Sequence, residues 1–91
     1  MTDEEIKNIE TKLLEELKSL LPETVEVTIK PYMRYSYMCK VCFSILSGDV
    51  LFADVYYFSL RNSEYWHKFV RAMVSIVTDH LIVKENNYEA M

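Results

Sequence analysis

The sequence is poor in residues that build loops, with one glycine and two prolines among 91 residues. The single glycine, Gly48, excludes a glycine-rich phosphate loop, which needs several positions of close backbone approach. A hydrophobic content of 51% excludes a disordered chain. Long apolar runs are missing too, because Arg34, Lys40, Asp54 and Arg71 interrupt every stretch that approaches the roughly 20 residues of a membrane span. We therefore expect one folded domain with no membrane partner.

The N-terminal residues are acidic where a secretory signal would be basic, so we expect a cytoplasmic, intracellular protein. The net charge of −4 disfavours nonspecific nucleic-acid binding, because that affinity comes mainly from cations that neutralise phosphates. The acidic residues crowd into the first third of the chain. They are Asp3, Glu4, Glu5, Glu10, Glu15, Glu16, Glu23 and Glu26. On the first helix they alternate with lysines, which predicts a solvated face.

A helix is predicted over residues 3–20. Thr2 and Glu5 have the spacing of a capping box, and Pro22 ends the segment. One apolar stripe recurs at steps of three and four residues. Its members are Ile6, Ile9, Leu13, Leu17, Leu20 and Leu21.

Three strands are predicted over residues 24–30, 33–46 and 50–58, each with alternating side chains or many β-branched and aromatic residues. Ser47-Gly48-Asp49 is the predicted hairpin turn. If it is a three-residue loop, Phe43 lies opposite Ala53. If Ser47 and Gly48 alone form the loop, Phe52 turns inward and Asp54 is buried, which is costly without a partner. We prefer the first register.

A last helix is predicted from Asn62 or Ser63 to about Lys84, followed by a fraying tail from about residue 85. Its apolar stripe consists of Trp66, Phe69, Val70, Met73, Ile76, Val77, His80 and Leu81.

The predicted fold is a single α+β domain over residues 1–91. Its order is α-β-β-β-α, a three-stranded antiparallel meander with two helices packed on one face. Double-stranded-RNA-binding domains share this order and grip phosphate with a lysine-rich start of the last helix. Here the corresponding segment, residues 62–68, offers one lysine and one glutamate. The similarity is therefore one of element order alone.

No catalytic or metal-binding motif is found, and we expect neither an enzyme nor a cofactor. Cys39 and Cys42 have CxxC spacing, but residues three apart on a strand point to opposite faces, so their sulfurs diverge. His67 and His80 lie about 20 Å apart along one helix and cannot share a ligand. A catalytic nucleophile in a recognisable motif is also missing.

Aromatic residues are dense in the strands, and the third strand has two apolar faces although only two helices can cover the sheet. An uncovered aromatic patch on a soluble protein usually marks an interface. The favoured hypothesis is a non-enzymatic protein-binding module that is itself a homodimer through its sheet. It would act as a small inhibitor or regulator of a larger protein, of the kind that viral and mobile-element genomes encode. The predicted partner-binding residues are Phe52, Tyr56, Phe58, Met38, Lys40 and Arg34.

Two alternatives remain at this point. Single-stranded nucleic acid could stack on Tyr56 and Phe58, with Arg34 and Lys40 on phosphate. A small-molecule pocket between sheet and helices would have to be lined by Tyr35, Tyr37 and His80.

Overall fold

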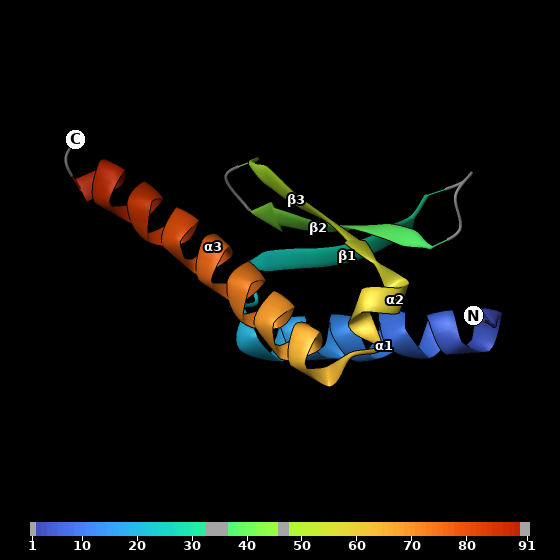
Figure 1. The fold of residues 1–91 in the computed structure, drawn as a ribbon. Coiled ribbons are helices and arrows are strands. Elements are labelled where there is room, and N and C mark those ends of the chain that lie inside the picture. Colours follow the sequence, from blue (N-terminus) through green and yellow to red (C-terminus); the bar gives the residue numbers. More distant parts are fainter. Residues whose placement is uncertain (1, 33–36, 46–47, 90–91) are drawn as a thin grey trace.

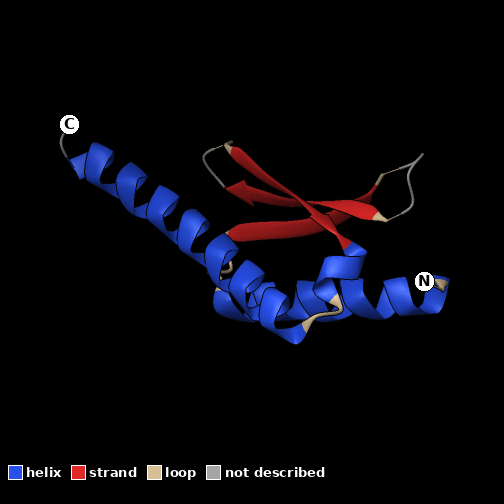
Figure 2. Cartoon of the chain, viewed as in Figure 1, coloured by secondary structure: helices blue, strands red, loops and turns tan. Residues whose placement is uncertain are grey.

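The chain folds into one three-stranded antiparallel sheet with helices on one side of it (Figures 1 and 2). The computed structural model describes residues 2–32, 37–45 and 48–89, and side-chain environments as far as residue 82. The order is α1 (Asp3–Leu20), β1 (Val25–Pro31), β2 (Met38–Ile45), β3 (Val50–Tyr56), α2 (Tyr57–Leu60) and α3 (Ser63–Glu89). The predicted α-β-β-β-α arrangement is confirmed, with the short helix α2 added before α3.

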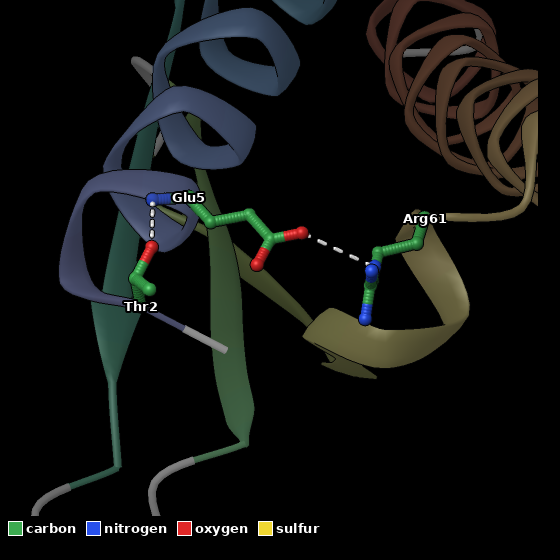
Figure 3. A network of polar contacts seen from close by, with 3 residues as sticks. All are labelled: Thr2, Glu5 and Arg61. Atoms are coloured by element: carbon green, nitrogen blue, oxygen red, sulfur yellow. Dashed lines mark hydrogen bonds and ion pairs between the residues drawn. The ribbon is translucent and has the colours of Figure 1, made fainter.

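Helix α1 begins and ends where its sequence signals predict. The Thr2 hydroxyl accepts a hydrogen bond from the Glu5 backbone N–H at 3.1 Å, which caps the first turn. The Glu5 carboxylate forms an ion pair with Arg61 at 3.2 Å, so the start of α1 is tied to the end of α2 (Figure 3). Leu13 and Leu17 of the apolar stripe are fully buried.

Two glutamates of α1 accept hydrogen bonds from side chains between residues 57 and 66. Glu10 accepts from the Tyr57 hydroxyl at 2.8 Å, and Glu16 accepts from the Trp66 indole N–H at 2.5 Å. With the Glu5–Arg61 pair, three carboxylates thus connect α1 to α2 and α3. The expectation of a solvated acidic face is wrong for these three residues.

The strand register differs from the preferred one by two residues. Phe43 lies opposite Leu51, and Val41 lies opposite Ala53. Because side chains alternate with a period of two, this shift leaves every β3 side chain on its predicted face. The Ile45 N–H donates to the Asp49 carbonyl, so Asp49 belongs to the ladder rather than to the turn. Gly48 has φ 94°, the left-handed conformation that favours glycine, whereas Ser47 lies outside the described residues.

Strand β3 ends at Tyr56, two residues before the predicted end. The Tyr57 N–H donates to the Tyr37 carbonyl, and the chain then turns into α2. The Tyr57 ring is 1% exposed and fills the core where α1, α2 and the sheet meet. The first part of the predicted second strand, residues 33–36, lies outside the described residues.

Helix α3 is capped by Asn62, whose side-chain oxygen accepts from the backbone N–H groups of Glu64 and Tyr65. Phe69, Val70 and Val77 of the predicted stripe are buried, but Ile76 is 53% exposed and Val74 packs on the core instead. The helix continues to Glu89, beyond the predicted end near Lys84. Its length of about 40 Å carries its C-terminal end past the β2–β3 turn (Figure 1).

One hydrophobic core joins both layers. The inward side chains of all three strands pack with the apolar stripes of α1 and α3 and with Tyr57 and Leu60 of α2. The opposite face of the sheet faces away from all described helices (Figure 2).

Candidate protein-interaction surface

The face of the sheet turned away from the helices, here called the outer face, consists of four rows of side chains. Each row takes one outward residue from β1 or the residue just after it, one from β2 and one from β3. The backbone pairing gives the rows Glu26–Ser44–Val50, Thr28–Cys42–Phe52, Lys30–Lys40–Asp54 and Tyr32–Met38–Tyr56. Three charged residues therefore share the third row, between an aromatic residue on one side and two on the other, and Glu26 lies at the end of the face.

Lys40 is the centre of this surface. Its ammonium group lies 5.7 Å from the centroid of the Tyr32 ring and 5.1 Å from that of the Phe52 ring. Both distances fall within the range of cation–π attraction. Lys40 also lies directly opposite Asp54 across the β2–β3 ladder. The lysine thus links rings on two edge segments of the sheet.

Asp54 is held by Tyr32, whose hydroxyl donates to the carboxylate at 2.5 Å. This hydrogen bond raises the pKa of Tyr32, because the neutral phenol donates and an ionised one would face a carboxylate. Tyr32 follows β1 and Asp54 lies on β3, so the contact spans the middle strand. The polar centre of the outer face is consequently ordered before any partner binds.

Two rings on the outer face are more than half exposed to solvent. Phe52 is 62% exposed and Tyr56 is 55% exposed, whereas Met38 and Lys40 are half-buried beside them. Large apolar groups that a monomer leaves in water contribute their burial energy only when something covers them. The structure thus brings four of the six predicted partner-binding residues together on one face.

Phe58 and Arg34 do not join this group. Phe58 lies on α2 rather than on β3, and its ring packs on Tyr37 at a centroid distance of 4.9 Å. Phe58 was predicted on the outer face because the alternation of the predicted strand continued beyond Tyr56. Arg34 lies outside the described residues.

Sequence reasoning missed Tyr32 as a member of the surface. The alternation of β1 contained the signal, because Glu26, Thr28, Lys30 and Tyr32 share one parity. The predicted strand ends at Lys30, directly before Pro31, but the Tyr32 N–H still donates to the Met38 carbonyl at 3.2 Å. The pairing therefore continues through the proline.

The two cysteines are on opposite faces of β2, as their spacing predicts. Cys39 points into the core and Cys42 toward the outer face, and both are buried and free. Burial raises the pKa of the Cys39 thiol to about 11, although the neighbouring Tyr57 hydroxyl acts in the opposite direction. Among the described residues, no three His, Cys, Asp or Glu side chains converge as a metal site would need.

The residues of the hypothetical small-molecule pocket do not meet. His80 contacts the Asp49 carboxylate at 3.2 Å, beside the β2–β3 turn, whereas Tyr37 precedes the other end of β2. Eight residues of strand separate these positions, or about 26 Å. Tyr35 lies outside the described residues.

Comparisons with models of protein families, with curated proteins and with solved structures found no match. Within the described residues, no helix combines the length and the hydrophobicity that crossing a bilayer requires.

Proposed function

We propose that this chain is a non-enzymatic protein-binding module whose partner covers the outer face of the sheet. The observation that carries the proposal is the exposure of Phe52 and Tyr56 on an otherwise ordered surface. A larger protein bound there would be regulated or inhibited by occlusion of its own surface. Self-association of the module through its sheet is part of the same proposal.

The composition of the outer face supports a protein partner. Interfaces typically combine aromatic anchors at their centre with polar groups at the rim. Phe52, Tyr56 and Met38 supply the anchors. Lys40 and Asp54 are opposite charges with partners already in place, so their desolvation costs less than that of two isolated ions.

Site-specific photo-crosslinking in cells tests the proposal. A benzophenone amino acid replaces Phe52 in one variant and Tyr65 in the other. Tyr65 is a matched control, because it is an exposed aromatic residue on α3, away from the outer face. We expect a discrete crosslinked product from position 52 at least tenfold more abundant than any from position 65.

A Tyr56→Ser substitution added to the position-52 probe should remove that product while circular dichroism reports an unchanged fold. Mass spectrometry then distinguishes a foreign protein from a second 10.8 kDa copy. Equal crosslinking from both positions, or a product that survives Tyr56→Ser, would show that the outer face is not the binding surface.

The alternative of single-stranded nucleic acid on the same face remains a second proposal. Stacking would use Phe52 and Tyr56, and Lys30 and Lys40 would have to neutralise phosphates. The proximity of Asp54 to Lys40 favours the protein partner, because a phosphate there would face a carboxylate. Binding of an oligothymidylate that weakens between 50 and 200 mM salt by about 0.4 logarithmic units per phosphate contact, from a slope of about 0.7 per contact for each tenfold change in salt, would favour the nucleic acid.

A further inference from the structure

The outer edge of β3 offers unpaired backbone groups at defined positions. The sheet order β1-β2-β3 places β3 at an edge. Ile45 donates to Asp49 and Tyr57 donates to Tyr37, so the odd-numbered residues of β3 between these pairs bond to β2. The N–H and C=O groups of the residues between them therefore point away from β2. These residues are Val50, Phe52, Asp54 and Tyr56.

The two edges of the sheet are protected differently. The β1 edge ends in Lys30 and Pro31, residues that discourage strand addition, and α1 packs against this strand. Strand β3, in contrast, contains neither lysine nor proline. Its single charge, Asp54, is held by Tyr32. In Figure 1 the beginning of β3 lies away from α1, and its C-terminal end leads directly into α2.

We propose that a second copy of this chain pairs with β3 along this edge, antiparallel and centred on Ala53, to form a continuous six-stranded sheet. In this register Phe52 pairs with Asp54 of the second copy, and Val50 pairs with Tyr56. The four pairs exchange about six backbone hydrogen bonds, because Tyr56 is the N-cap of α2 and its carbonyl accepts the first bond of that helix. This is the register in which all four outward residues have a partner. A shift by two residues leaves either Val50 or Tyr56 of each copy without one.

Charge complementarity argues for this occupant and this register. Asp54 of one copy faces Phe52 of the other, above whose ring the Lys40 ammonium lies at 5.1 Å. Each Asp54 carboxylate therefore approaches the Lys40 ammonium group of the other copy, and the two-fold axis makes this contact occur twice. A register centred on Asp54 would instead place two carboxylates opposite each other, which is destabilising.

The inward side chains fit the same arrangement. Leu51 and Ala53 are only half-buried although they point toward the core side of the sheet. Pairing places Leu51 beside Val55 of the second copy and Ala53 beside its own equivalent. The hydrophobic cores of the two copies then meet across the paired β3 strands. The two outer faces also become one surface, with both pairs of exposed rings still open to a foreign partner.

Disulfide trapping tests the register. Ala53→Cys places two thiols opposite each other at a non-hydrogen-bonded pair, where Cα atoms approach to about 4.5 Å, within the range of a disulfide. Leu51→Cys is the matched control, because its thiol would face Val55. We expect at least tenfold more disulfide-linked dimer from Ala53→Cys under mild oxidation. Equal amounts, or more from Leu51→Cys, would overturn the proposed pairing.

Sedimentation velocity tests the edge itself. The parent chain should show a species of twice the 10.8 kDa monomer mass at high concentration. Val50→Pro removes an outward N–H without removing a hydrogen bond to β2 and should weaken dimerisation at least tenfold, whereas Val50→Thr should not. A Val50→Pro variant that dimerises as the parent does, or a parent that stays monomeric, would refute the edge pairing.

This inference specifies the self-association that the proposed function includes, and it can fail separately. Crosslinking of a foreign protein from position 52 depends on the outer face alone. If that product forms while Ala53→Cys gives no dimer, the edge pairing is wrong and the protein-binding function stands. If Ala53→Cys dimerises and position 52 captures no foreign protein, the edge pairing stands and the proposed binding of a foreign protein is wrong.

Discussion

Replacing Tyr57 with phenylalanine tests how α1 is held to the rest of the domain. The substitution keeps the buried ring and removes only the hydroxyl that donates to Glu10 at 2.8 Å. A hydrogen bond to a charged acceptor contributes about 1.5–3 kcal/mol. Because Glu10 is half-buried, water replaces part of the lost donor, and we expect a loss of about 1–2 kcal/mol.

Urea denaturation followed by tryptophan fluorescence measures this loss. Trp66 is the single tryptophan, and its indole donates to Glu16 of α1, so its emission reports the contact between α1 and α3. A double-mutant cycle with Glu10→Ala isolates the Tyr57–Glu10 interaction from other effects of each change. We expect a coupling energy of about 1–2 kcal/mol, inside the range for directly contacting residues.

Two outcomes would refute this reasoning. A Tyr57→Phe variant as stable as the parent would mean that the hydroxyl exchanges a protein acceptor for water at no cost. A coupling energy below about 0.3 kcal/mol would mean that the two sites act independently. In either case the contact between α1 and α2 would depend on apolar packing and on the Glu5–Arg61 ion pair.

Two further predictions concern stability. Raising the pH above about 9 should destabilise the domain, because the Cys39 thiol keeps its proton to about 11 in the folded chain while the unfolded thiol loses it near 9.0. This contribution is complete below pH 9 and lost by pH 11. It amounts to at most about 3 kcal/mol, and the pH dependence of the urea midpoint should flatten in Cys39→Ala. Trp66→Ala should cost about 3–5 kcal/mol, from lost ring packing and the lost donor to Glu16. A thermal midpoint followed by circular dichroism within a few degrees of the parent would contradict it.

Local signals in the sequence were sufficient for element types and faces. The Thr2 cap and the parity of β2 and β3 each depend on neighbouring residues, and each is confirmed. The stripe of α1 is confirmed except at Leu20, which is 54% exposed. Patterns of period two also tolerate a register error of two residues without exchanging inside for outside. The inward direction of Leu51 and Val55 was therefore predictable although their partners on β2 were not.

Long-range contacts were not predictable in the same way. Nothing near Glu10 or Glu16 in the sequence distinguishes them from the solvated glutamates of α1, because their donors lie 47 and 50 residues away. The end of β3 was missed for a related reason. Tyr57 and Phe58 continue an excellent strand pattern, but the Tyr57 ring fills the core, and this requires the chain to turn into α2. Because Phe58 belongs to α2, it does not lie on the outer face.

The ties from α1 to residues 57–66 have a consequence for biosynthesis. Helix α1 leaves the ribosome first, yet the groups that hold its glutamates are Tyr57, Arg61 and Trp66. At about 5–20 residues per second, several seconds pass before those side chains emerge from the exit tunnel. During this interval only β1 and β2 can cover the apolar stripe of α1, and its three glutamates lack these donors. Folding of this domain is therefore complete only after residues 57–66 have emerged.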